Sequence, residues 1–503
     1  MIALGPVGAS LGGVALFAGS GLGLAELSPA LRRIPLARRL GYSYLLGLVA
    51  VAGALYALSH FAAVPLRAPA VWTIAAALAG AGLGARMVRV VRVVRVGRAG
   101  RSPSIQDDVT PRRSLVSRLG GAVPLACFGV MAIVCCGLLA EAATNPEMDW
   151  DGRMTWSTQA RYIRAAGTVD AEVLRNRRWS VTHPQYPLLL PVAQVAVLEA
   201  FAQGEDSHAY RALYVGCFVA WLLVLYDGAR RLAGRIPAAL AVLFAALVPF
   251  FAHGEGGAFS AYSDLPLAGF YGAALALLLL GPRRLASGWA AGLFLAGAVL
   301  AKNEGLLLAG VVLALAAGRA LAALRAAGRE HGPGPAARRL VRRRLLGTAI
   351  AGALAIAALA LLVSWRAGVP NREDEAYLSR FGLADLWPGL VSHFYVLARA
   401  CVGRMITYMD WTTFWWMIPA VLAAGRRRLP LVLLAAAAAP PAIGWLAYAV
   451  NPQPAFVASV TWDRFLLQAS VPLMLLVAGA LADILQRRRR ARTPPRELAP
   501  TAR

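Results

Sequence analysis

Long apolar segments recur along almost the whole chain, and they constrain its fold more than any other feature. Most are long enough to cross the roughly 30 Å hydrocarbon layer of a bilayer as a helix. Hydrophobic residues make up 59% of the 503 positions, against about half in soluble domains. Among spanning structures, single helices satisfy every backbone hydrogen bond within themselves. We therefore expect an all-α polytopic membrane protein.

About thirteen apolar segments fit this description. Each is bounded by charged, proline or glycine residues that mark its ends. The expected spans cover residues 7–25, 42–62, 71–87, 122–142, 212–226, 237–251, 265–280, 289–301, 306–321, 345–365, 411–424, 431–450 and 465–485.

Arginine clusters between the spans predict the topology. The net charge is +26, but its pattern follows the positive-inside rule of membrane proteins and does not indicate a nucleic-acid partner. The clusters become uniformly cytoplasmic only if the apolar segment 186–201 lies in the membrane interface instead of crossing. The basic loop 86–118 is then suited to anionic lipid headgroups. This pattern predicts a multi-pass protein of the cytoplasmic (inner) membrane.

The same pattern divides the chain into four parts. Residues 1–118 form an N-terminal three-span extension with its basic loop, and residues 119–345 form a core that contains a large outer loop, 144–210. Residues 346–486 supply the remaining spans, and 487–503 a basic cytoplasmic tail. Most of the 25 Asp and Glu residues fall on the outer side in this topology. We therefore expect the chemistry to face away from the cytosol.

The strongest candidates for chemistry are two carboxylates at the start of the outer loop. Asp149 and Asp151 flank Trp150 and lie close to Trp156. Such a pair can supply a general base and a helper, and it is also the only pair we would assign to a divalent cation, if one binds. Ordinary loop carboxylates are the alternative. Asp151 is the preferred catalytic residue and Asp149 the second.

Further polar groups lie where hydropathy predicts none. In HPQYPLLLP, the residues His183, Gln185 and Tyr186 lie at the start of the interfacial helix. Pro184 and Pro187 are suited to begin that helix. His183 is a candidate for binding phosphate, or else a surface histidine. Candidates for contacting substrate also include residues near the outer ends of spans; these are Glu255, Asp264, Asn303, Glu304 and Asp463. Helix capping is the alternative role for Asp264.

Three cations at the outer boundary suit a phosphate-bearing ligand. Lys302 is the only lysine among 51 basic residues, and a charge between two apolar runs is a functional candidate by default. A structural pairing of Lys302 with Glu304 is the alternative. Arg211 begins an inward span and Arg464 the last one, and guanidinium groups bind phosphate well.

The order of DGRMTWSTQAR, HPQYPLLLP, YSDLPL, AKNEG and WDRFLLQ resembles the integral-membrane GT-C glycosyltransferases. This superfamily includes the protein O-mannosyltransferases and the aminoarabinose transferase of lipid A. The resemblance covers residues 122–485. The resemblance implies a polyprenyl-phosphate sugar as donor and interfacial helices in the first outer loop. It also implies an acidic residue of that loop at the reaction centre, and Asp151 is the matching position.

The expected function is therefore transfer of a hexosyl or pentosyl group from a lipid-phosphate donor to an extracytoplasmic hydroxyl, with inversion. The partners are the lipid-linked donor, the acceptor and membrane lipids. No cofactor is expected beyond a possible divalent cation. A transporter or a flippase for lipid-linked glycans is the alternative. It would favour broken helices at mid-membrane and internal pseudo-symmetry.

Overall fold

The computed structural model describes residues 5–98, 115–176, 178, 183–281, 287–331, 335–370, 383–407, 411–425 and 430–492. Within these ranges the chain is all-helical and contains no strand. The helices are α1 (Pro6–Leu27), α2 (Leu36–Ala62), α3 (Ala68–Arg98), α4 (Leu115–Thr144), η1 (Gly152–Ser157), α5 (Thr158–Ala166), α6 (Glu172–Arg175), α7 (Leu189–Ala200), η3 (Ala209–Arg211), α8 (Ala212–Ala233), α9 (Arg235–Ala246), α10 (Pro249–His253), α11 (Asp264–Leu278), α12 (Gly288–Ala301), α13 (Glu304–His331), α14 (Pro335–Arg366), α16 (Leu383–Thr407), α17 (Phe414–Ala424), α18 (Leu431–Ala449), α19 (Pro454–Gln468) and α20 (Ser470–Arg492).

Nine of the described helices are long and apolar enough to cross a membrane, which confirms a multi-pass membrane protein. They are α1, α2, α3, α4, α8 with η3, α13, α14, α18 and α20. Five shorter apolar helices accompany them. Four of these, α9, α11, α12 and α17, fall on expected spans, and α7 falls on the segment expected in the interface.

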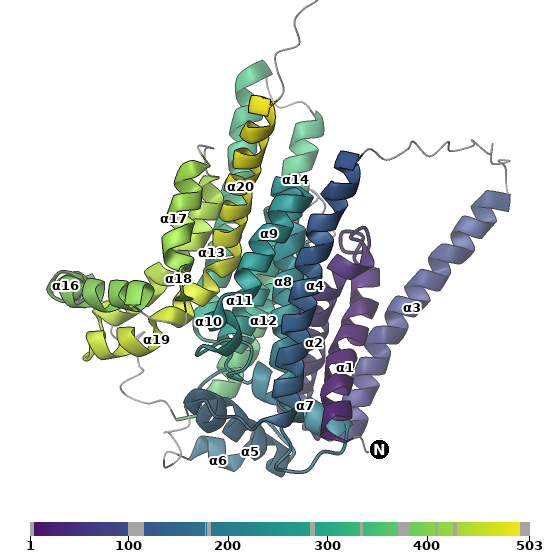
Figure 1. Ribbon diagram of the computed structural model, residues 1–503. Coiled ribbons are helices and arrows are strands. Elements are labelled where there is room, and N and C mark those ends of the chain that lie inside the picture. Colours follow the sequence, from purple (N-terminus) through teal and green to yellow (C-terminus); the bar gives the residue numbers. More distant parts are fainter. Residues whose placement is uncertain are drawn as a thin grey trace, which may run out of the picture.

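The long helices run side by side and give the molecule two distinct ends (Figure 1). At one end lie α5 and α6, together with the start of α11 and the end of α12; we call this the carboxylate end. At the opposite end, α20 finishes in a run of arginines and α14 begins with another; we call this the arginine end. With about 1.5 Å per residue, the 15 residues of α11 give this helix a length of roughly 22 Å.

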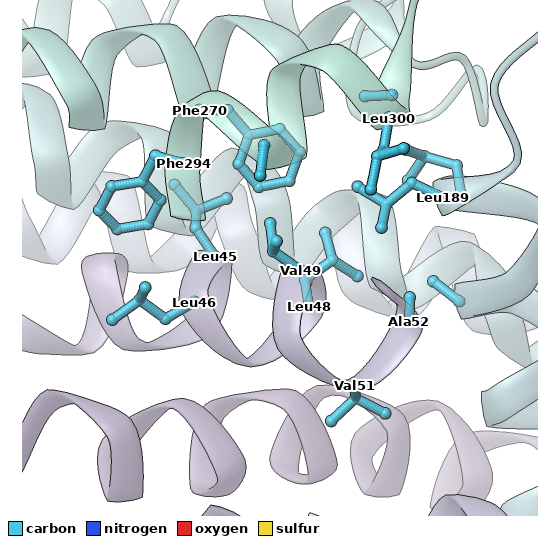
Figure 2. Close-up of a cluster of buried hydrophobic side chains, with 14 of the residues drawn as sticks. Leu45, Leu46, Leu48, Val49, Val51, Ala52, Leu189, Phe270, Phe294 and Leu300 are labelled. Atoms are coloured by element: carbon cyan, nitrogen blue, oxygen red, sulfur yellow. The ribbon is translucent and has the colours of Figure 1, made fainter. Parts of the chain in front are cut away.

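Helix α2 forms the centre of one of the two hydrophobic cores. Nearly every side chain from Gly41 to Ala52 is buried. Figure 2 shows Leu45, Leu48 and Val49 of α2 facing Phe270 of α11 and Phe294 of α12, with Leu189 of α7 beside them. The helix that the sequence assigned to an N-terminal extension therefore packs within the core that α11 and α12 share.

Small residues allow α1 and α2 to approach each other closely. A Cβ added at Gly21 would collide with the carbonyl of Ser43, and one at Gly47 would collide with that of Phe17. Lipid supplies no hydrophobic force between helices, so close van der Waals packing over small residues is the principal attraction. Glycine at these positions is thus required by the α1–α2 interface.

The last expected span, 465–485, is divided in the structure. Helix α19 ends at Gln468 and α20 begins at Ser470, and α19 lies across the long helices together with α16 (Figure 1). WDRFLLQ therefore belongs to a separate transverse helix and does not begin the final span. The change of direction carries Arg464 and Gln468 towards the start of α11.

Candidate functional site

Asp151 and Arg464 form the first part of a charged cluster at the carboxylate end. Arg464 Nη1 donates to Asp151 Oδ2 at 2.6 Å, and its Nη2 lies 3.3 Å from Glu255 Oε2. The guanidinium stacks over Tyr262, with 4.7 Å between Cζ and the ring centroid. The phenol oxygen of Tyr262 accepts the backbone N–H of Asp151 at 3.0 Å. Three segments that are distant in sequence therefore meet at one guanidinium: the outer loop, the loop before α11, and α19.

Lys302 and Asp264 form the second part. The ammonium lies 2.7 Å from Asp264 Oδ1 and 3.2 Å from Glu304 Oε1. Gln468 Nε2 donates to the same Asp264 oxygen at 3.0 Å. Helix α11 has Ser263 as its N-cap without a side-chain capping bond, so Asp264 binds Lys302 and Gln468 instead of capping. The pairing of Lys302 with Glu304 that the sequence suggested is present, but Asp264 is the closer partner.

Arg464 joins the two parts. Its charge interacts with both Asp151 and Asp264, and Lys302 in turn interacts with Arg464. A five-residue stretch of α19, from Arg464 to Gln468, therefore contacts the outer loop through Asp151 and the α11 terminus through Asp264. The cluster holds two cations that can bind an anion. Three of its hydrogen-bond donors are also available to such an anion. Within the described residues, Arg464 Nε, the Tyr262 hydroxyl and one N–H of Lys302 have no hydrogen-bond acceptor.

A tight approach of the outer loop to the segment before α11 positions Asp151. A Cβ at Gly152 would collide with the carbonyl of Ser260 and would lie 3.0 Å from the Glu147 carboxyl group. Directly after Asp151 the chain forms η1, a turn of π-helix. Such turns are rare and are often found at functional sites. The glycine and this turn together hold the Asp151 carboxylate towards Arg464.

The aromatic residues of the outer loop form a stack beside the cluster. The rings of Trp156 and Tyr186 have centroids 5.5 Å apart, and His183 stacks on Tyr186 at 5.0 Å. The prediction that Pro184 and Pro187 begin a helix is wrong. Helix α7 begins at Leu189, and the preceding residues form a turn with a left-handed backbone at His183, φ 50°.

Arg366, at the end of α14, ties this turn to the Lys302 segment. Its Nε donates to the carbonyl of Gln185 at 2.8 Å, and its Nη2 donates to the side chain of Asn303. The backbone carbonyl of Gln185 and the side chain of Asn303 thus bind the same guanidinium. The aromatic stack and the ion cluster are neighbours because of this residue.

Two residues predicted to contact the ligand are used by the fold instead. Arg211 is 1% exposed and donates to the carbonyls of Asn145, Pro146 and Phe259. Its Nε lies 3.5 Å from Glu147 Oε2, and its Cζ lies 3.8 Å from the centroid of the Phe259 ring. It therefore clamps the outer loop, and its burial keeps a phosphate from reaching the guanidinium.

Asp463 also points away from the cluster. Its oxygens accept from Trp411 Nε1 at 2.7 Å and from Arg404 Nε at 2.6 Å. Successive helical residues point about 100° apart, since a turn holds 3.6 residues. Asp463 and Arg464 therefore serve different neighbours.

Glu147 and Asp149, at the start of the outer loop, have raised pKa values. Burial raises the pKa of Glu147 to about 7, and the nearby charge of Arg211 opposes only part of this rise. Burial, together with the charge of Glu255, also raises the pKa of Asp149. Across the described part of the chain, Asp149 has no ion-pair partner within 4 Å.

The acidic residues do not form an evident metal site. No group of three His, Cys, Asp or Glu side chains among the described residues is arranged to hold a metal ion. Asp151 Oδ2 is already bound to Arg464. The donor set of Asp149 and Asp151 thus does not fit a resident divalent cation.

Three residues of the site were not among the sequence candidates. Tyr262, Arg366 and Gln468 lie in or beside segments that the sequence singled out, since AYSDLP contains Tyr262 and WDRFLLQ contains Gln468. Arg366 follows directly after an expected span. An arginine at the outer end of a span departs from the positive-inside pattern, and this departure is the signal that could have identified it.

Comparison with known proteins does not place the chain in a family. No protein-family description, no curated protein and no solved structure matches it.

Proposed function

We propose that the protein transfers a glycosyl group from a polyprenyl-phosphate donor to a hydroxyl outside the cytosol. The observation that carries the proposal is the cluster in which Arg464 pairs with Asp151 beside the Asp264–Lys302 pair. A carboxylate that can accept a proton and two cations that can bind a phosphate are the groups this reaction needs. They are contributed by the outer loop, α11, α12 and α19.

In the proposed reaction, the acceptor oxygen forms a bond to the anomeric carbon as the bond from that carbon to the phosphate oxygen breaks. The electron pair leaves with the phosphate, whose charge Lys302 and Arg464 stabilise. The acceptor proton passes to Asp151, which acts as general base. Attack from the face opposite the phosphate inverts the configuration. No step passes through a metal ion.

Substrate binding also provides a way to release the base. In the free protein Asp151 Oδ2 is paired with Arg464 Nη1 at 2.6 Å. A donor phosphate competes with Asp151 for the same guanidinium, because both are oxyanions that bind it through charge-assisted hydrogen bonds. Donor binding would thus free the Asp151 carboxylate for the acceptor. Asp149, whose pKa is raised, lies close enough to assist.

The proposed topology places this cluster outside the cytosol in the inner membrane. The nine long helices and the four shorter ones on expected spans make up thirteen crossings, with α7 at the membrane surface. The arginine end then faces the cytosol, in keeping with the positive-inside rule. The donor lipid would lie with its tail between helices and its phosphate at the cluster.

The test uses the purified protein in lipid nanodiscs and a panel of polyprenyl-phosphate sugars labelled in the sugar. Because the acceptor is unidentified, release of labelled sugar to water is measured alongside transfer to a panel of envelope glycans. The proposal expects at least one donor to be consumed, and Asp151→Asn to slow that reaction about 10²–10⁴-fold.

The variant Asp206→Asn is the matched control, since it removes an exposed carboxylate of the same outer loop that lies outside the cluster. Consumption of no donor would count against glycosyl transfer, and an Asp151→Asn variant that works at the wild-type rate would remove Asp151 as the base.

A further inference from the structure

A second polar site lies at the arginine end. A cavity of about 220 Å³ opens between the ends of α8 and α11, the start of α12, and the facing sides of α13 and α14. A single water needs only roughly 10–15 Å³ of such space. The cavity can therefore hold a polar group with several atoms.

Four arginines line this cavity: Arg231, Arg319, Arg343 and Arg344. They come from α8, α13 and α14, so three helices distant in sequence direct positive charge to one place. No Asp or Glu is among the described lining residues. Like charges gathered without an acid repel one another, and an anion in the cavity would relieve that repulsion.

The nearest acid is already engaged. Asp227 accepts from Arg38 Nη1 at 2.7 Å and from the Tyr42 hydroxyl at 3.0 Å, and it also pairs with Arg231 Nη2. Arg231 still has a second terminal nitrogen, Nη1, which is buried and has no hydrogen-bond partner in the described structure. A buried donor without an acceptor costs free energy, so this nitrogen is suited to donate to an anion bound in the cavity.

The N-terminus of α12 adds to the positive potential at the cavity. Helix α12 begins at Gly288, and Ser287 and Gly288 line the cavity, so the first N–H groups of α12 face this region. Helix N-termini favour anions. The opposing end of α11 is neutralised in part, because Arg319 donates to the carbonyl of Leu279. A Cβ at Gly288 would collide with the carbonyl of Gly347, and this close contact holds α12 against the arginines of α14.

We propose that this cavity binds a phosphate group, carried either by an anionic lipid headgroup or by a soluble phosphate. The site is separate from the ion cluster, since α11 runs between them with Asp264 at one end and Leu277 and Leu278 lining the cavity at the other. It does not depend on glycosyl transfer. Its ligand reaches it from the arginine side.

The test measures binding to delipidated protein in detergent by native mass spectrometry. The probes are phosphatidylglycerol, phosphatidylcholine and inorganic phosphate. The site variant is Arg343→Gln/Arg344→Gln. The control is Arg339→Gln/Arg342→Gln, which removes the same two charges from the same helix outside the cavity lining.

The site variant should bind the phosphate probe at least about tenfold more weakly than the wild type, as expected for the loss of charge-assisted hydrogen bonds, and the control should be unchanged. Binding of phosphatidylglycerol but not of inorganic phosphate would assign the site to lipid, and the reverse would assign it to a soluble phosphate. Phosphatidylcholine, which has no net charge, should bind equally to the wild type and the site variant. Binding of neither anionic probe, or equal loss in both double variants, would overturn the proposal.

A second variant keeps every charge. Ala316→Leu adds volume to a lining residue that is 7% exposed, so it should fill part of the cavity and weaken binding while the arginines remain. If Ala316→Leu protein of unchanged thermal stability binds the probe as well as the wild type, the cavity is not the binding site.

Discussion

Arg464 Nη1 lies 2.6 Å from Asp151 Oδ2, although 313 residues separate them in the chain. The pair links the two parts of the charged cluster, because Arg464 interacts with both the outer loop and the α11 terminus. The side chains are 13% and 26% exposed, so a ligand can reach them from the outside. This arrangement leads to a prediction for donor binding.

Arg464→Gln should weaken the binding of polyprenyl phosphate by about 10- to 100-fold, since a hydrogen bond to a charged group contributes about 1.5–3 kcal/mol. Arg399→Gln, on the exposed side of α16, is the control and should bind normally. Affinity is measured by native mass spectrometry of the lipid complex. An unchanged affinity in Arg464→Gln would show that the donor phosphate binds elsewhere.

Lys302→Met should destabilise the protein strongly. It leaves Asp264, 1% exposed, as a buried charge without its cation, and loss of one partner of a buried pair costs about 3–5 kcal/mol. Adding Asp264→Asn should restore much of the lost stability, because the uncompensated charge is removed. Thermal unfolding in detergent gives the comparison. A double variant no more stable than Lys302→Met would mean that the ion pair is not the source of the effect.

Glu147 should make the stability depend on pH. Its pKa is about 7 in the folded protein against an ordinary value of 4.5, so the folded state binds the proton more tightly than the unfolded state. The free energy of unfolding should therefore fall as pH rises from about 4.5 to 7, by up to about 3 kcal/mol. Glu147→Gln should flatten this part of the profile, measured by thermal unfolding across that range. A wild-type slope that survives in Glu147→Gln would assign the effect to another group.

Gly21→Ala should disrupt the packing of α1 against α2. The added methyl group collides with the Ser43 carbonyl, and overpacking of a close interface costs about 1–3 kcal/mol. Gly19→Ala is a matched control on the same helix, since nothing lies within 4 Å of its Cβ position. It should be neutral or stabilising by up to about 1 kcal/mol, the helix propensity difference. Equal stability of the two variants would contradict the tight interface.

The orientation in the membrane can be tested with cysteines in a background free of the five native ones. Met148→Cys, at a side chain 69% exposed, should react in intact cells with a maleimide that does not cross the membrane. Arg342→Cys, exposed at the arginine end, should react only after the membrane is opened. The reverse pattern would place the charged cluster on the cytosolic side.

Much of the fold could be predicted from the sequence. Apolar runs mark the membrane helices directly, because length and hydropathy are properties of each segment alone. The break between α19 and α20 could not be predicted in the same way. Leu466 and Leu467 continue the apolar pattern up to it, and the turn at Ala469 depends on tertiary contacts such as that of Gln468 with Asp264.

Some residues of the charged cluster could be singled out from the sequence, but their pairings could not. Asp151, Lys302 and Asp264 stood out because charged groups at the ends of apolar runs are conspicuous. The partner of each depends on helix packing, which the sequence does not reveal. Arg211 shows the consequence. Its position at the start of a span suited phosphate binding, but the structure buries it and uses its donors on loop carbonyls.

The burial of α2 among α7, α11 and α12 also bears on how the chain can be shortened. A version starting at α4 would leave Phe270 and Phe294 facing hydrocarbon and would remove the wall against which Leu189 rests. The first helices are therefore not a detachable appendage. Trimming the molecule to the region that carries the charged cluster would remove part of the scaffold that holds that cluster together.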